Sequence, residues 1–168
     1  MTRPSPEQRI TPGPGQESVW DYPRPPRLEP TTRRIRIVHH DRTVADTTAA
    51  MRVLETSHPP TYYLPPADVD QSLLRPAAGA SFCEWKGPAS YFDLVVEGEA
   101  LPRVAWTYPQ PTGGFAPIAK YYAFYPGPLE ACFVDDERVQ SQAGDFYGGW
   151  ITRDVVGPFK GASGTAGW

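Results

Sequence analysis

The sequence predicts a mainly β fold, either a small barrel or a sandwich, with one or two short helices between the strands. Three observations lead to this class. Charged and apolar residues alternate in short runs, turn-forming residues separate these runs, and few stretches show the longer apolar period of a helix. An extended proline-rich N-terminal arm and a glycine/aromatic C-terminal tail flank the predicted strands.

The proline excess is concentrated near the N-terminus. The 168 residues include 21 prolines and 15 glycines, and eight of the prolines fall in residues 1–30. Bulky side chains stand among these prolines and would bury nothing in a free tail: Val19, Trp20 and Tyr22. We therefore predict a flexible N-terminus over residues 1–16, then one domain over 17–168 that begins with a packed arm, 17–30.

Charge and hydropathy exclude some partners. The formal net charge is −3, which gives no general attraction to phosphate backbones, so we expect no nucleic acid. No apolar run approaches the ~20 residues of a membrane span, and the first residues lack the apolar core of a secretion signal. We therefore expect a cytoplasmic protein without a membrane partner, in which Cys83 and Cys132 are free thiols.

The first predicted hairpin joins residues 34–38 to residues 43–47. Charged and apolar residues alternate along its first strand, as in a half-buried sheet. His39 and His40 fall in the connecting turn and are expected to be solvated. A further strand is predicted over residues 50–56, because a Pro-Pro pair follows that no helix continues through.

Residues 65–74 predict a short helix, with prolines at its start and acidic residues in its first turn. Val69 and Leu73 stand one helical turn apart, with Leu74 beside them, so these three should face the core. The Asp-Val-Asp at 68–70 is interpreted as helix-start acids and not as magnesium ligands.

The second half of the chain predicts mostly short strands. The strand over residues 89–96 is rich in β-branched and aromatic residues. The elements expected after it are a partner strand at 103–108, a loop at 109–114, a helical turn at 117–120, a strand at 121–125, and a hairpin of 131–134 with 137–139. In the tail, residues 140–168, large rings alternate with glycines, which predicts backbone lying close against the domain that it wraps.

Five stretches carry a family resemblance: Glu-Ser-Val-Trp-Asp-Tyr-Pro at 17–23, Val-Leu-Glu-Thr-Ser-His-Pro-Pro at 53–60, Cys-Glu-Trp-Lys-Gly at 83–87, Ala-Trp-Thr-Tyr-Pro at 105–109 and Tyr-Gly-Gly-Trp at 147–150. Together they resemble the DUF427 family in a long, actinobacterial-type form. The resemblance implies a compact, mostly β fold and supplies no reaction. A nucleotidyltransferase label is sometimes attached to this family. The chain lacks the Gly-Ser before paired strand carboxylates that such enzymes use.

Motifs for metals, cofactors and the common hydrolase triads are missing from the sequence. Three histidines and two cysteines do not have zinc-ligand spacing. In Gly-Pro-Phe-Lys-Gly at 157–161 the lysine precedes the glycine, which is the reverse of a phosphate loop. We therefore expect no metal site and no cofactor.

The candidate catalytic residues are Glu55, His58 and Cys83. His58 lies near two tyrosines and is the best candidate for a general acid or base. Cys83 could be a nucleophile if Lys86 lowered its pKa. The favoured alternative is an inert cysteine, because in a straight strand Cys83 would share a buried face with Trp85.

A candidate ligand-binding wall combines five rings and one cation: Tyr63, Trp85, Lys86, Tyr91, Trp106 and Tyr108. Such a wall suits a small planar ligand, whereas each ring taken alone is explained as well by core packing. Lys86 could anchor an anion or pair on the surface with Glu84 or Asp93.

Three kinds of function are consistent with these patterns. The leading hypothesis is a binding protein that holds a small anionic or planar molecule in an aromatic-lined pocket. The alternatives are a small-molecule-modifying enzyme, nucleotidyltransferase-like or dependent on His58 and Cys83, and a protein-interaction module that uses the arm and tail. The sequence leaves a homodimer open.

Overall fold

The computed structural model describes residues 3–5, 7–144 and 146–168. The elements follow in chain order: β1 (Glu17–Ser18), η1 (Val19–Asp21), β2 (Arg27–Pro30), β3 (Ile35–His39), β4 (Arg42–Thr47), β5 (Met51–Leu54), β6 (Thr61–Tyr63), η2 (Pro66–Asp68), η3 (Gln71–Leu73), β7 (Leu74–Cys83), β8 (Gly87–Val96), β9 (Glu99–Thr107), η4 (Gly113–Ile118), β10 (Tyr122–Phe124), β11 (Ala131–Val134), β12 (Glu137–Arg138), β13 (Gln140–Ser141), β14 (Trp150–Ile151) and β15 (Val155–Val156).

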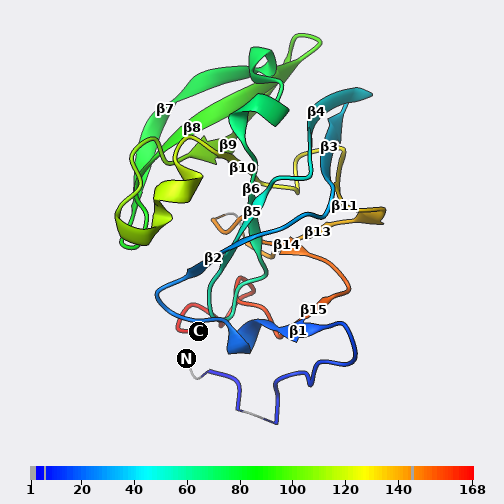
Figure 1. The fold of residues 1–168 in the computed structure, drawn as a ribbon, viewed down its shortest axis with the longest axis vertical. Helices are drawn as coiled ribbons and strands as arrows, with labels where there is room; N and C mark the ends of the chain where they lie inside the picture. The colour runs from blue at the N-terminus through cyan, green and yellow to red at the C-terminus, as the bar shows by residue number, and fades with distance from the viewer. Residues whose placement is uncertain (1–2, 6, 145) are drawn as a thin grey trace.

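Three sheets form the body of the fold. Two have four strands, in the orders β10-β9-β8-β7 and β12-β11-β3-β4, and the third has the order β2-β5-β6. Figure 1 shows β7, β8 and β9 as a broad curved layer, with β3 and β4 on the other side of the molecule and β5 and β6 between. No sheet in the described part of the chain closes on itself, so the sandwich prediction is confirmed and the barrel alternative is wrong.

The main core lies between these sheets and is built from alternating strand positions. In β3, Ile35 and Ile37 are fully buried, whereas the alternate residues Arg36 and Val38 are half-buried. Trp150 of the tail enters this core, where its Nε1 donates to the Phe124 carbonyl at 3.1 Å. The predicted hairpins of residues 34–47 and 131–139 are both present, because their alternation and turn residues are local signals.

His39 is not in the solvated turn that the sequence predicted. It is the last residue of β3, it is buried, and its Nδ1 accepts a hydrogen bond from the Glu130 backbone N–H at 3.1 Å. The turn begins one residue later, where His40 and Asp41 adopt positive φ. A loop distant in sequence covers His39, which no local pattern could reveal.

The predicted helix over residues 65–74 is two short 3-10 turns, η2 and η3. Val69 separates them because it bridges Ala45 of β4, a contact that extends the backbone at that point. Asp70 caps η3 by accepting from the Ser72 N–H at 3.2 Å. The three apolar residues of this segment are nevertheless buried as predicted: Val69, Leu73 and Leu74.

The sequence analysis missed β7. Its residues Leu74–Cys83 include proline, glycine and four alanines or serines with no clear period, and most of them are exposed. Pairing with β8 holds this strand in place, with a register shift between Pro76 and Ala80. The helical turn predicted at 117–120 also begins earlier, at Gly113.

The arm and the tail contact each other. Figure 1 shows both chain ends at one end of the molecule, and there β1 pairs in parallel with β15. The Trp20 and Trp168 rings lie edge to face, 5.6 Å apart. The predicted anchor residues of the arm are buried in a hydrophobic cluster that is separate from the main core: Val19, Trp20 and Tyr22.

Flexibility over residues 1–16 stays a prediction. Met1, Thr2 and Pro6 lie outside the described residues. Ile10 donates its N–H to the Gly157 carbonyl at 3.0 Å, and the Arg9 guanidinium lies 4.7 Å from the centre of the Trp20 ring.

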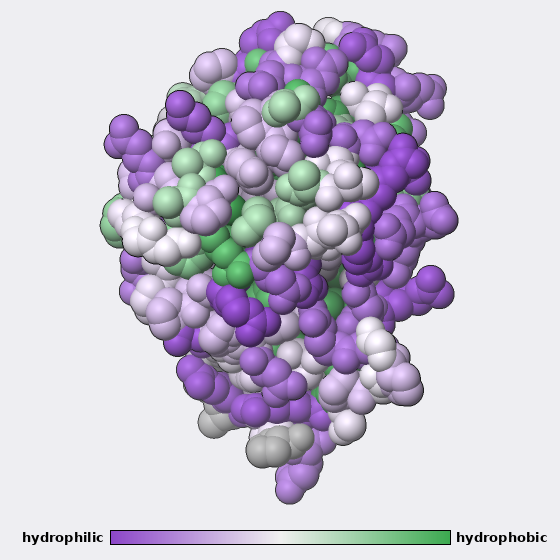
Figure 2. Space-filling model, in the orientation of Figure 1, coloured by the Kyte–Doolittle hydropathy of each residue, from purple (hydrophilic) through white to green (hydrophobic). Residues whose placement is uncertain are grey.

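The face shown in Figure 2 is mostly hydrophilic toward the chain ends, and apolar side chains gather higher up, toward the four-stranded sheets. In the described part of the chain, no helix has the length and apolar character needed to cross a membrane.

Candidate functional site

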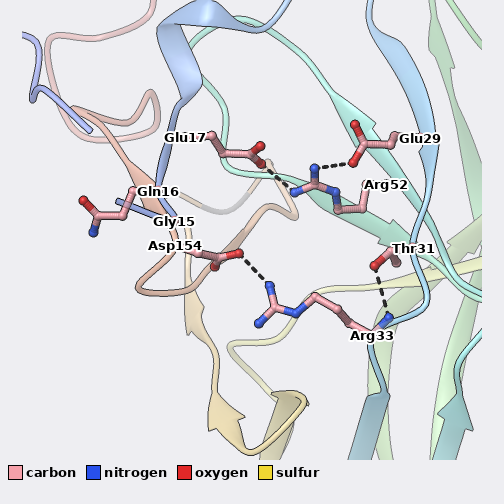
Figure 3. Close-up of a pocket in the computed structure, with 8 residues that line it drawn as sticks. All are labelled: Gly15, Gln16, Glu17, Glu29, Thr31, Arg33, Arg52 and Asp154. Carbon is pink, nitrogen blue, oxygen red and sulfur yellow. Dashed lines mark hydrogen bonds and ion pairs between the residues drawn. The ribbon is translucent and has the colours of Figure 1, made fainter. Parts of the chain in front are cut away.

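A first cavity, of about 380 Å³, lies between the arm, β5 and the tail, and its charged groups already pair with one another (Figure 3). Arg52 donates to Glu17 at 2.6 Å and to Glu29 at 2.5 Å. Arg33 donates to Asp154 at 2.6 Å. Because each cation here has its carboxylate, the cavity offers no free charge to a ligand, and its network joins the arm and tail to the sheets.

A second cavity, of about 260 Å³, is the candidate site, and we call it the aromatic pocket. Eight of the nine residues predicted from sequence line it: Glu55, His58, Tyr63, Cys83, Lys86, Tyr91, Trp106 and Tyr108. They come from β6, β7, β8, β9 and the loops after β5, β7 and β9. The fold therefore brings together the predicted catalytic and ligand-binding residues in one place.

Trp85 is the predicted residue that does not line the pocket. Cys83 pairs with Gly87 across a tight turn, so residues 84–86 reverse the chain and do not alternate as in a straight strand. Trp85 is half-buried beside the pocket's hydrophobic cluster, and its carbonyl accepts from Thr112 Oγ1 at 3.0 Å. Cys83 and Lys86 thus face the pocket while Trp85 supports the hairpin from outside.

Lys86 brings a buried positive charge to the pocket. The residue is only 8% exposed, and its Nζ lies 5.6 Å from the centre of the Tyr108 ring and 5.7 Å from that of Phe115. Among the described residues, no carboxylate lies within 4.0 Å of this ammonium and no side-chain hydrogen bond engages it. The surface pair with Glu84 or Asp93 is therefore wrong, and the faces of the Tyr108 and Phe115 rings partly offset the charge.

Hydrogen bonds fix the tautomer of His58. The Gly149 N–H donates to Gln142 Oε1 at 3.0 Å, which orients the amide so that its Nε2 donates to the Lys160 carbonyl at 2.7 Å and to His58 Nδ1 at 3.0 Å. Nδ1 is therefore an acceptor, and the proton of a neutral ring lies on Nε2. The nearest carboxylate oxygen, Glu55 Oε2, is 3.6 Å from Nε2, beyond hydrogen-bond length.

The imidazole of His58 is held neutral. Burial lowers its pKa to about 3, and the nearby positive charges of Lys160, Arg24 and Lys86 act in the same direction. A ring that is neutral at pH 7, with Nδ1 already occupied, is poorly arranged to accept a proton from a substrate. Its Nε2–H is instead a neutral hydrogen-bond donor.

The aromatic wall presents apolar ring faces, and its polar groups lie at the ring edges. Trp106 Nε1 donates to the Tyr63 hydroxyl at 3.2 Å, and the two rings lie 6.4 Å apart, edge to face. The Tyr91 hydroxyl bonds Ser81 Oγ at 2.8 Å. Burial raises the pKa of Tyr63 and Tyr108 above the usual value, so both are uncharged phenols at neutral pH. The four rings belong to one hydrophobic cluster that is separate from the main core: Tyr63, Tyr91, Trp106 and Tyr108. They therefore pack against one another and line the pocket at the same time.

The two cysteines differ in their surroundings. Cys83 is half-buried and lines the pocket, whereas Cys132 is buried in the main core, where burial raises the pKa of its thiol to about 12. Both are free thiols.

The sequence analysis missed the part of the site that the tail supplies. Gln142 orients His58, the Tyr147 ring lies 4.8 Å from the His58 ring, and Lys160 also lines the pocket. The available signal was the Gly-Gly pair at 148–149. A Cβ on Gly148 would overlap Trp106 Cη2, so only glycine lets the tail lie this close to the pocket wall.

In the described residues, no three histidine, cysteine or acidic side chains are placed to hold a metal ion together. The Asp68 and Asp70 carboxylates are engaged locally, with Asp68 accepting from Thr47 Oγ1 at 2.7 Å.

Comparison with known proteins adds one finding. Residues 27–135 match a family model described as a domain of unknown function, DUF427. No curated protein matches the chain. The matched region contains the predicted site residues, whereas Gln142, Tyr147 and Lys160 lie beyond it.

Proposed function

The chain belongs to the DUF427 family, whose function is unknown, and we propose that its aromatic pocket binds a small planar anion. The observation that carries this proposal is Lys86, a buried ammonium that faces aromatic rings and, among the described residues, has no carboxylate within 4.0 Å. A buried charge without a counter-ion is costly, and an anionic ligand would supply the missing partner.

The neighbouring charges favour the same ligand. Lys160 also lines the pocket, and Arg24 is close enough to His58 to lower the pKa of its ring. Among the described lining residues Glu55 is the acidic one, and Arg24 donates to it at 3.2 Å. The pocket therefore has an excess of positive charge, which repels cations and attracts anions.

The remaining groups favour a flat molecule with an acceptor. Tyr63, Trp106 and Tyr108 offer aromatic surfaces, and His58 offers its Nε2–H as a donor. Binding is favoured over acid–base catalysis, because the His58 nitrogen without a proton is occupied by Gln142.

Calorimetric titration with benzoate tests this proposal, with benzamide as the uncharged planar control and acetate as the anion without a ring. We expect benzoate to bind most tightly and the Lys86→Met variant to bind it at least about tenfold more weakly, as for a lost charged hydrogen bond. Lys120→Met, which removes an exposed lysine, should bind like wild type.

Alkylation locates the bound molecule. Benzoate should slow the reaction of Cys83 with iodoacetamide, because this thiol lines the pocket, and should leave Cys132 unreactive throughout. Equal benzoate affinity in wild type and Lys86→Met, or no binding of benzoate at all, would show that the proposal is wrong.

A further inference from the structure

The aromatic pocket adjoins another cavity, of about 610 Å³, which we call the side cavity. Five residues line both, which makes the two spaces neighbours: Ser81, Tyr91, Tyr125, Phe146 and Tyr147. The aromatic pocket alone is small for a ligand site, whereas the side cavity is well within the usual range of about 300–1,000 Å³.

The side cavity differs from the aromatic pocket in its chemistry. Its remaining walls include Pro102, Val104 and Pro128. The polar groups at the boundary are already used: the Tyr125 hydroxyl donates to the Phe146 carbonyl at 3.1 Å, and the Tyr91 hydroxyl bonds Ser81. This boundary therefore offers apolar surface and ring faces and few free hydrogen-bonding groups.

Among the described residues that line the side cavity, Arg103 is the charged one, and its guanidinium is already engaged. Its Nη1 donates to the Ala78 carbonyl at 2.7 Å, and its guanidinium lies 4.2 Å from the centre of the Tyr91 ring. An anion should therefore bind more favourably beside Lys86 in the aromatic pocket than beside Arg103 in the side cavity.

Two exposed phenylalanines mark the path between the pocket and solvent. Phe82 is 75% exposed and lines the aromatic pocket, and Phe146 is 70% exposed and lines both cavities. Exposing such large apolar side chains to water is unfavourable. An apolar group lying against them would bury this surface and offset part of the free-energy cost.

We propose that the ligand has two parts, an acidic planar head in the aromatic pocket and an apolar chain that passes Phe146 into the side cavity. This inference rests on the proposed function and names its ligand class, the amphipathic aryl carboxylates. Lys86, a buried cation with no carboxylate of the described residues within 4.0 Å, and the apolar walls of the side cavity match that division of the molecule.

A series of 4-alkylbenzoates tests the proposal by calorimetric titration, from benzoate through 4-propylbenzoate to 4-hexylbenzoate. We expect the affinity to rise about fourfold for each methylene that becomes buried. Ser141→Trp, which places a large ring at the exposed Ser141 of the side-cavity wall, should abolish this rise and leave benzoate binding unchanged. The matched control Ser141→Ala should keep the rise, and Pro128→Trp should repeat the effect of Ser141→Trp from another wall.

The outcomes separate this inference from the proposed function. If benzoate binds through Lys86 but chain length has no effect, or the rise survives in both tryptophan variants, the two-part ligand is wrong and the planar-anion proposal stands. If benzoate fails to bind wild type, the proposed function itself is wrong. A rise that is lost in the tryptophan variants and kept in Ser141→Ala supports both.

Discussion

Among single residues, His58 shows most clearly how burial changes the protonation state of a side chain. Its ring is enclosed by Tyr147 and Gln142, and three neighbouring cations oppose a further positive charge. The lowered pKa has a consequence for stability as well as for function, because the unfolded chain exposes an ordinary histidine.

We predict that the protein loses stability as the pH falls from about 6.5 toward 3. In this window the unfolded state holds a proton on residue 58 that the folded state does not, so the free energy of unfolding falls by up to about 1.4 kcal/mol per pH unit. Denaturant titrations between pH 7 and pH 4.5 measure the slope.

A His58→Asn variant provides the comparison, because an asparagine oxygen can replace Nδ1 as the acceptor for Gln142 without titrating. Its slope should be clearly shallower than that of wild type. Burial also lowers the pKa of His39, so the double variant with His39→Asn should be flatter still. An unchanged slope in His58→Asn would contradict the neutral, buried imidazole.

Among the elements, the tail segment after β13 depends on close backbone packing. Gly148 lies directly on the Trp106 ring, and Gly149 lies against Pro59 and Gln142. This approach carries Tyr147 onto His58 and thereby forms one wall of the aromatic pocket.

We predict that Gly148→Ala destabilises the fold by about 1–3 kcal/mol, because the added methyl group must displace Trp106 or the tail. Gly114→Ala is the matched control, since a Cβ there meets nothing within 4 Å, and it should change stability by less than about 0.5 kcal/mol. Equilibrium unfolding in urea measures both. Equal stability of the two variants would show that the tail does not lie where the structure has it.

For the whole molecule, β1 and η1 of the arm form a clasp with the tail, outside the region that matches the family. β1 pairs with β15, Trp20 Nε1 donates to the Pro158 carbonyl at 2.9 Å, and the Trp20 ring meets Trp168. The same tail reaches the aromatic pocket through Lys160, so it takes part both in the clasp and in a site whose predicted residues lie within the family match.

A double-mutant cycle tests the clasp. Trp20→Ala should cost about 3–5 kcal/mol of stability because a buried ring is lost. Combined with Trp168→Ala, it should show a coupling of about 0.5–1.5 kcal/mol, the value of an edge-to-face aromatic pair. Additive effects of the two substitutions would mean that these rings do not meet in solution.

Local patterns predicted the elements whose causes are local. The alternation in β3 and the hairpin of β11 with β12 were predictable because a strand's two faces and a turn's backbone depend on neighbouring residues. β7 escaped prediction because its partner strand holds it, and the helix expected at 65–74 was divided by the bridge of Val69 to Ala45.

The sequence by itself determined the mainly β class, the bulky side chains that anchor the arm, and eight of the residues that line the aromatic pocket. Only the tertiary structure decided that these residues converge, that Trp85 is excluded, and that Gln142, Tyr147 and Lys160 complete the site. The physical reason is that side-chain period and turn chemistry act over a few residues. The meeting of His58 with Gln142, 84 positions apart, depends on sheet register and on the packing of the tail against Trp106.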